Sequence, residues 1–259
     1  MQNSMYSALF GALSNEHRLN SIANNLANVH TTGFKSDKLS FKDTFAMYAH
    51  DHIMEPMVHL RSKKLFPEPQ HLSRARIAYA QTDFDQGSLK VTGAPLDVAI
   101  SGNGFFKVRT PRGDFYTRNG HFRLTSEGML ITEQGFPVIG NGGEITLPDG
   151  IKNLTIAENG DIYGDGEAMG SIDLVEVDNP LGLEKLGNNM YRPRKGANVQ
   201  EFESNSYMVQ GFLEISNVNP VYEMVNMIEA QRQFEAYAKI MQTTESIDKE
   251  AITKVGRAR

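Results

Sequence analysis

Residues 22–29 read Ile-Ala-Asn-Asn-Leu-Ala-Asn-Val, an apolar helical pattern interrupted repeatedly by asparagine. Asn24, Asn25 and Asn28 are poor helix formers, each roughly 0.7 kcal/mol less favourable than alanine, so together they cost about 2 kcal/mol. Two explanations remain open. Buried amides between packed helices would offset the cost and fix the helix register, or the asparagines belong to a polar face near a frayed helix end.

The surrounding residues 4–29 repeat apolar side chains at spacings of three and four, which predicts an amphipathic helix. Thr31, Thr32 and Gly33 supply a stop signal. The apolar stripe consists of Met5, Leu9, Ala12, Leu13, Leu19, Ile22, Ala23, Leu26 and Val29.

A second, longer helix is predicted at the other end of the chain, over residues 220–254. Asn219 is a suitable N-cap, Pro220 fits the first helical position, and Glu223 complements the helix dipole in the first turn. Its apolar positions are Val221, Met224, Val225, Met227, Ile228, Phe234, Ala238, Met241 and Ile247.

Between residues 81 and 215 the apolar period changes to two. Phe106 and Val108 alternate with Lys107 and Arg109, and turn signals such as Asn159-Gly-Asp161 recur at short intervals. Short alternating runs separated by glycine-bearing turns predict an all-β domain. Residues 34–80 fit neither period, because prolines interrupt them, and we expect a linker that is extended or partly helical.

The sequence therefore predicts an α+β protein with a mainly-β central domain and a helix at each end. Expected boundaries are 1–33 for an N-terminal core helix, 34–80 for a linker or extended segment, 81–215 for an all-β outer domain, and 216–259 for a C-terminal core helix. Each helix carries an apolar stripe that needs cover. We expect the helices to pair as a coiled-coil-like core domain, or to pack against those of neighbouring subunits.

Composition narrows the classes of function. The chain has 259 residues, a formal net charge of −5 and no cysteine. The acidic balance argues against a nucleic-acid binder, and the lack of cysteine excludes disulfides, thiolate metal sites and a cysteine nucleophile. No apolar run is long enough to span a bilayer, so membrane insertion is not expected. The N-terminal stretch lacks the features of a secretory signal, so we expect it not to be cleaved.

No constellation of side chains indicates catalysis, a cofactor or a metal. His50 and His52, with Glu55 and His59 nearby, match no defined metal motif, and a polar linker bearing histidines is the better interpretation. Gly102-Asn-Gly104 lacks the third glycine and the following helix of a nucleotide loop. Asp161 and Asp165 lie in turn signatures.

Three long segments, in order, resemble the flagellar rod and hook proteins. They are residues 21–35 (Ser-Ile-Ala-Asn-Asn-Leu-Ala-Asn-Val-His-Thr-Thr-Gly-Phe-Lys), residues 93–106 (Gly-Ala-Pro-Leu-Asp-Val-Ala-Ile-Ser-Gly-Asn-Gly-Phe-Phe) and residues 216–235, which begin Ser-Asn-Val-Asn-Pro-Val-Tyr-Glu-Met-Val. Residues 140–148 and 255–257 are similar to the proximal-rod type, and the distal-rod type is the alternative.

This resemblance implies a structural subunit of the flagellar basal-body rod, which crosses the periplasm and transmits torque to the hook. It implies export through the flagellar type III apparatus, followed by helical polymerisation with copies of itself and neighbouring rod proteins. The terminal helices would line the core of the rod. The expected assembly interface comprises Leu9, Leu13, Leu19, Ile22, Asn24, Asn25, Leu26, Asn28, Val221, Met224, Val225, Ile228, Phe234 and Met241.

Two functions from other classes stay open on the residues alone. An enzyme would need a pocket with convergent polar groups within residues 81–215. A soluble binding module would use its terminal helices to recognise a partner and would remain monomeric at high concentration.

Overall fold

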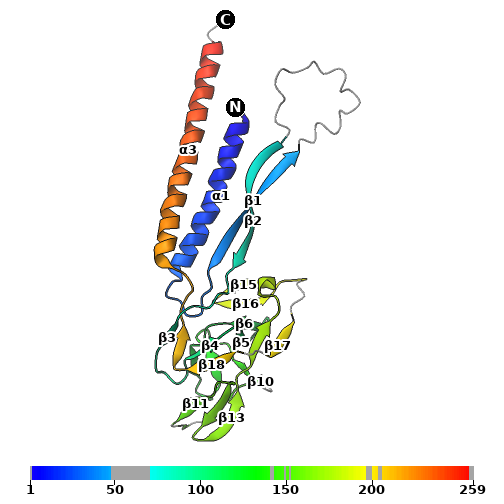
Figure 1. Cartoon of the computed structure of the whole chain (residues 1–259), viewed down its shortest axis with the longest axis vertical. Coiled ribbons are helices and arrows are strands. Elements are labelled where there is room, and N and C mark those ends of the chain that lie inside the picture. Colours follow the sequence, from blue (N-terminus) through cyan, green and yellow to red (C-terminus); the bar gives the residue numbers. More distant parts are fainter. Residues whose placement is uncertain are drawn as a thin grey trace, which may run out of the picture. The chain divides into compact units, whose positions relative to one another are not determined.

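The computed structural model describes residues 2–47, 71–140, 143–148, 150–151, 153–196, 200–203 and 206–256. The chain divides into two compact units (Figure 1). The first consists of Met1–Ala23, Lys38–Gln81 and Tyr222–Arg259, and the second consists of Asn24–Asp37 and Thr82–Val221. Both units are therefore assembled from segments that are far apart in the sequence.

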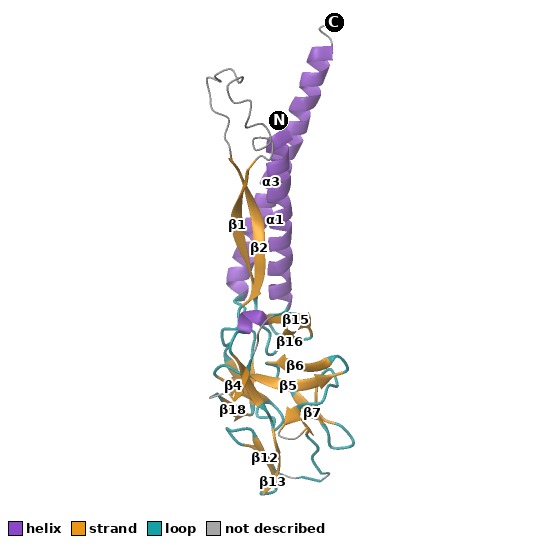
Figure 2. Ribbon diagram, turned by 90° about the vertical axis from the view of Figure 1, so that its right-hand side faces the viewer, coloured by secondary structure: helices purple, strands orange, loops and turns teal. Residues whose placement is uncertain are grey.

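The first unit holds two long helices and a two-stranded ribbon. Helix α1 runs from Gln2 to Ala27 and helix α3 from Pro220 to Gly256. The ribbon pairs β1 (Asp37–Met47) with β2 (His71–Thr82). Figures 1 and 2 both show α1 and α3 side by side. Most of the ribbon lies in residues 34–80, the range expected to be an extended or partly helical linker.

Helix α3 begins as its sequence predicts. Pro220 is its first residue, and the Asn219 side-chain oxygen accepts a hydrogen bond from the backbone N–H of Val221 at 3.1 Å. Glu223 lies in the first turn, where a negative charge interacts favourably with the helix dipole. The cap and the proline together fix the point at which the chain enters the helix.

The second unit is built from short antiparallel strands, with a six-stranded sheet in the order β15-β16-β6-β5-β14-β17. Two-stranded sheets pair β18 with β4, β19 with β3, β7 with β8 and β10 with β9. A three-stranded sheet has the order β11-β12-β13. The elements are β3 (Leu89–Val91), β4 (Val98–Ser101), β5 (Phe105–Thr110), β6 (Gly113–Thr117), β7 (Phe122–Leu124), β8 (Leu130–Thr132), β9 (Ile139–Gly140), β10 (Gly143–Glu144), β11 (Leu154–Ile156), β12 (Asp161–Gly164), β13 (Glu167–Ser171), β14 (Leu174–Val177), the 3-10 helix η2 (Pro180–Gly182), β15 (Leu183–Gly187), β16 (Met190–Pro193), β17 (Glu201–Glu203), β18 (Tyr207–Gln210) and β19 (Phe212–Glu214).

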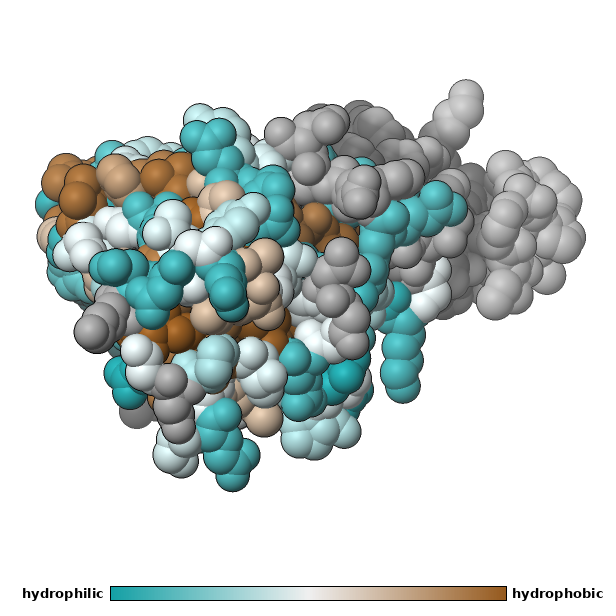
Figure 3. Space-filling view, turned by 90° about the horizontal axis from the view of Figure 1, so that it is seen from below, coloured by the Kyte–Doolittle hydropathy of each residue, from teal (hydrophilic) through white to brown (hydrophobic). Residues whose placement is uncertain are grey.

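The six-stranded sheet separates two apolar clusters, because successive residues of a strand point to opposite faces. Phe106 belongs to the larger cluster and packs edge-on against Phe122, with ring centroids 5.1 Å apart. Phe105 and Tyr191 belong to the smaller cluster, which Phe84 covers. Burying each such side chain stabilises the fold by roughly 1.5–3 kcal/mol. Figure 3, which views the structure from below, shows hydrophobic patches among polar residues on that face.

The predicted α+β class is confirmed: a helix lies at each end of the chain and the central region is mainly β. The second unit also includes Asn24–Asp37. This segment includes the end of α1 and the residues that lead into β1. The second unit therefore contains the β core together with the chain that follows the first helix.

Candidate functional site

Helix α3 exposes a series of large apolar side chains. Val221 is 69% exposed, Ile228 51% and Ile252 72%, and half-exposed residues lie between them along the helix. The exposed members are Val221, Tyr222, Met224, Val225, Ile228, Phe234, Ile240, Ile247 and Ile252. An extended apolar surface of this kind on a folded chain marks an interaction site.

Helix α1 buries several small residues in its first half and exposes large apolar ones there. Ala8, Ala12 and Asn15 are buried, whereas Leu9 and Leu13 are 41% and 43% exposed. Gly11 faces Tyr237 of α3 so closely that an added Cβ would lie 2.5 Å from the ring atom Cζ. Gly11 therefore lies at a close contact between the two helices, and Leu9 and Leu13 remain available on the surface.

The predicted assembly residues fall into three groups by exposure. The exposed ones are Leu9, Leu13, Asn24, Val221, Met224, Val225, Ile228 and Phe234. Those of intermediate exposure are Leu19, Leu26, Asn28 and Met241. Only Ile22 and Asn25 are buried within the chain. Most of the predicted residues thus lie on the surface, where a neighbouring molecule can reach them.

The asparagines near the end of α1 have local partners. Asn25 is buried and forms a reciprocal pair with the backbone of Asp37: its Nδ2 donates to the carbonyl at 3.0 Å, and its Oδ1 accepts from the N–H at 2.9 Å. Asn28 donates to the carbonyl of Asn24 at 2.8 Å. For Asn25, the pairing with the start of β1 therefore offsets the cost in helix propensity.

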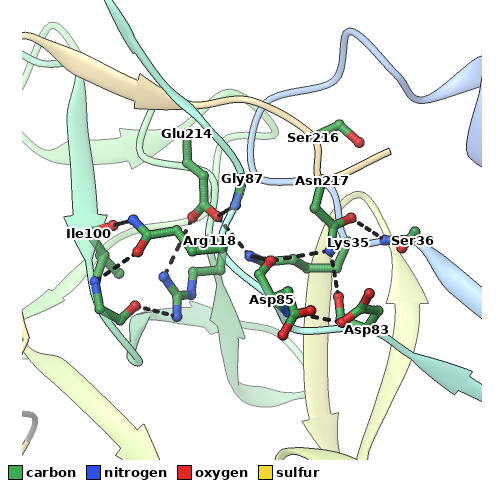
Figure 4. Close-up of polar contacts among 12 residues, drawn as sticks. Lys35, Ser36, Asp83, Asp85, Gly87, Ile100, Arg118, Glu214, Ser216 and Asn217 are labelled. Atoms are coloured by element: carbon green, nitrogen blue, oxygen red, sulfur yellow. Dashed lines mark hydrogen bonds and ion pairs between the residues drawn. The ribbon is translucent and has the colours of Figure 1, made fainter. Parts of the chain in front are cut away.

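A buried ionic cluster joins three separate segments of the second unit (Figure 4). Lys35 follows α1, Arg118 follows β6, and Glu214 ends β19. The Lys35 Nζ lies 2.7 Å from Glu214 Oε1 and donates to the carbonyl of Asp85 at 2.8 Å. The backbone N–H of Gly87 donates to the same Glu214 oxygen at 2.8 Å. Arg118 Nη1 lies 3.5 Å from the other carboxylate oxygen. We call Lys35, Arg118 and Glu214 the ionic anchor.

The electrostatics of the ionic anchor follow from its burial. Burial lowers the pKa of the Lys35 amine, the Glu214 carboxylate partly offsets this, and the charge of Arg118 lowers the pKa further. Burial also lowers the pKa of the Arg118 guanidinium, which lies 5.2 Å from the centroid of the Phe105 ring. A single carboxylate thus bonds to two cations, and its removal would take away the largest favourable charge interaction of each.

Asn217 extends the ionic anchor toward α3. Its Oδ1 accepts a hydrogen bond from the backbone N–H of Ser36 at 2.8 Å, and its Nδ2 donates to the carbonyls of Asp83 and Asp85 at 2.9 and 3.2 Å (Figure 4). One side chain therefore holds together the segment after α1, the segment after β2 and the segment before α3.

Lys185 adds a second tie to the segment after α1. Its Nζ donates to the carbonyl of Lys35 at 2.8 Å, lies 3.2 Å from the Asp37 carboxylate, and sits 3.7 Å from the centroid of the Phe34 ring. Sequence reasoning assigned no role to Lys185 or to the ionic anchor. The available signal was the presence of charged residues within otherwise apolar or turn-forming segments, which alone cannot identify their partners.

The described residues contain no group of three or more side chains able to hold a metal ion. The histidines at positions 50, 52 and 59 lie outside the described residues. Among the helices that the structure describes, none has both the length and the apolar character needed to cross a membrane.

Comparisons with known protein families find three matching regions. Residues 5–35 match the family described as "Flagella basal body rod protein". Residues 99–164 match "Flagellar hook protein FlgE/F/G D1 domain", and residues 209–254 match "Flagellar basal body rod FlgEFG protein C-terminal".

Similar proteins extend over nearly the whole chain. Flagellar basal-body rod protein FlgF of Caulobacter vibrioides is 33% identical over 99% of both chains. FlgF of Mesorhizobium japonicum is 34% identical over 99% of both chains. Flagellar basal-body rod protein FlgG of Borreliella burgdorferi is 34% identical over 95% of this chain and 96% of its own.

Proposed function

Because this chain belongs to the family of flagellar basal-body rod proteins, in which it is a structural subunit and not an enzyme, we propose that it polymerises helically through its terminal helices in the proximal rod. The observation that carries the proposal is the exposed apolar surface of α3. A rod subunit assembles with other rod proteins in the flagellar axis, and such a surface provides the contact.

The energetics favour assembly through this surface. Full burial of a large aliphatic side chain contributes roughly 1.5–3 kcal/mol, so each half-exposed residue of α3 can contribute about 1 kcal/mol when a neighbour covers it. Heterologous contacts that do not close into a ring produce helical growth. In our proposal α1 and α3 pair as a coiled-coil-like core, with Gly11 against Tyr237 in the seam, and their outer faces contact neighbouring subunits.

The ionic anchor suits a shaft that transmits torque. Lys35 and Glu214 hold the segment that follows α1 and the segment that precedes α3 to the same β core. Rotation applied to the rod would otherwise be absorbed at these connections. We propose that the anchor stiffens them, and that the subunit reaches the rod across the periplasm after export by the flagellar type III apparatus.

The proximal rod is our choice over the distal rod, which is the alternative because relatives of both FlgF and FlgG type match the chain. The similarity of residues 140–148 and 255–257 to the proximal type supports this choice. Expression of this chain in one strain that lacks its proximal-rod protein FlgF and in another that lacks its distal-rod protein FlgG tests the choice. Restored motility in the first strain alone supports the proximal rod, and restored motility in the second strain alone overturns it.

Substitution Ile228→Asp tests assembly through α3. A charge in an apolar contact should abolish rods and motility, because an unpaired buried charge is costly. Thermal unfolding of the purified chain should stay unchanged, since Ile228 is 51% exposed before assembly. Gln233→Asp is the matched control, because Gln233 is already polar and exposed on the same helix.

Normal swimming of the Ile228→Asp strain would contradict the proposal. Sedimentation of the wild-type chain separates a binding module from a filament subunit. A wild-type chain that stays monomeric at high concentration and never co-purifies with basal bodies would favour the binding module.

A further inference from the structure

A polar cleft of about 760 Å³ opens in the second unit, next to the end of α1. Its lining includes Asn28 and Thr32 after the helix, Asn119 after β6, and Asn188 and Asn189 in the β15–β16 turn. We call it the amide cleft. Its volume lies within the roughly 300–1,000 Å³ typical of ligand sites, which is enough for a short peptide segment.

Asn119 offers an unused hydrogen-bond donor to the amide cleft. The side chain is only 6% exposed, and its Oδ1 accepts from the Thr32 hydroxyl at 2.8 Å and from the backbone N–H of His121 at 3.1 Å. The backbone donor fixes which end of the amide is the oxygen. The Nδ2 donates to no group in the described part of the chain.

Asn189 offers an unused acceptor beside it. This residue is also 6% exposed, and its Nδ2 donates to the carbonyl of Thr32 at 2.8 Å, so its Oδ1 is the free atom among the described residues. Asn188 and Asn189 both have positive φ, 51° and 56°, in the tight turn that links Gly187 to Met190. Asparagine tolerates this conformation better than most residues, and the turn holds the amide in place.

The two free groups open into the amide cleft. Among the described residues, the completely enclosed side-chain atoms without a partner are Arg118 Nε and Tyr191 Oη, and neither asparagine is among them. Both amides bond to Thr32, one to its hydroxyl and one to its carbonyl, so they lie close together. Both asparagines line the cleft, which therefore presents one donor and one acceptor on largely buried side chains.

A donor and an acceptor in this arrangement match a peptide group, whose carbonyl accepts and whose N–H donates. We propose that the amide cleft binds an extended main-chain segment of a second copy of this chain. The proposal rests on the proposed function, because in a helical assembly a surface on one subunit contacts a different surface on the next copy.

Photocrosslinking tests the occupant. A benzophenone amino acid replaces Asn188, which is exposed at the rim of the amide cleft, and the control replaces Asn159, an exposed turn residue outside it. In purified basal bodies we expect a peptide of a second copy attached at position 188, with none at position 159 and none in the free monomer. No product at 188, or attachment to a glycan or to a different rod protein, overturns the inference.

Asn119→Asp tests the free donor while keeping the hydrogen bonds that Asn119 Oδ1 accepts. Aspartate keeps the oxygen that Thr32 and His121 require, and replaces only the free donor with an oxygen that repels a peptide carbonyl. We expect about a tenfold lower crosslink yield, equivalent to ~1.4 kcal/mol or about one hydrogen bond. The yield is measured at a temperature where the variant is fully folded, because a carboxylate at this buried position also lowers thermal stability. Asn153→Asp makes the same chemical change outside the cleft and should leave the yield unchanged.

An undiminished yield in Asn119→Asp overturns the role of the free donor. If the wild-type chain enters basal bodies but position 188 captures no second copy, the inference fails and the proposed function stands. If the wild-type chain never enters basal bodies, the proposed function itself fails.

Discussion

Replacing Glu214 with glutamine removes the only carboxylate of the ionic anchor. The side chain is 1% exposed, and its oxygens face the Lys35 amine at 2.7 Å and the Arg118 guanidinium at 3.5 Å. Glutamine keeps the size but not the charge, so two buried cations would lose the carboxylate that both of them contact. Removing one partner of a buried ion pair typically costs about 3–5 kcal/mol.

Lys35→Met is the informative comparison. It leaves Glu214 with Arg118 as a charge-balanced pair and keeps the hydrogen bond from Gly87. The losses are the Lys35 bonds to Glu214 and Asp85, for which we expect about 1–3 kcal/mol. The glutamine variant should therefore be clearly the less stable of the two, although both change a single buried charge.

Thermal and urea unfolding of the purified full-length chain measure the difference. For a unit of this size, 1 kcal/mol shifts Tm by about 2–4 °C, so Glu214→Gln should lower Tm by about 6–20 °C. Glu250→Gln, on the exposed surface of α3 with its carboxylate near Lys254, is the control and should change little. A glutamine variant within about 1 kcal/mol of wild type, or a methionine variant that loses more, would refute the electrostatic account.

Asn25→Ala should destabilise the chain by about 1–3 kcal/mol, because it removes both hydrogen bonds between this side chain and the backbone of Asp37, each worth about 0.5–1.5 kcal/mol. Asn24→Ala, at an exposed position of the same helix, should stabilise the chain by up to about 0.7 kcal/mol, and equal effects of the two substitutions in urea unfolding would contradict the pairing. Gly11→Ala should fail to stabilise the wild-type chain, because the new Cβ meets the Tyr237 ring. The same substitution should stabilise the chain by roughly 0.5–1 kcal/mol in a Tyr237→Ala background. A double-mutant cycle that shows no coupling between the two positions would refute this contact. Burial alone would raise the pKa of Glu201, but hydrogen bonds from Tyr116 and Lys107 outweigh it and the pKa lies below the ordinary 4.5. The stabilisation from Glu201 is therefore present above pH 4.5 and is lost as the pH falls through the native pKa. Glu201→Gln should match the wild type in stability in strong acid and be less stable at neutral pH. A constant difference in stability across this pH range would contradict the prediction.

The helices were predictable because their signals are local. The spacing of apolar residues and the Asn219-Pro220 start lie within a few residues of each other, and both are present in the structure. The alternation of Phe106 with Lys107 likewise predicted a strand, since the period of two is a property of one segment. Leu124 shows the limit of that signal: it shares the expected face with Phe122 but is 41% exposed at the end of its short strand.

The ionic anchor and the ribbon were not predictable, because their partners are distant in the sequence. Lys35 and Glu214 are separated by 179 positions. No local pattern says that a lysine after one helix will meet a glutamate before the other. The same holds for Asn25, whose partner at Asp37 belongs to a strand that was not expected. Tertiary contacts decided these positions, whereas local periodicity decided the helices.

Accessibility of α3 in the assembled rod tests the central claim most directly. The chain contains no cysteine, so a single one at position 228 gives a background-free target for a water-soluble maleimide. A second variant carries its cysteine in place of Val91, a residue of the second unit that is 68% exposed. Both should react rapidly in the monomer. In purified basal bodies we expect position 228 to be protected while position 91 still reacts. Equal and rapid labelling of position 228 in the monomer and in basal bodies would contradict assembly through the terminal helices.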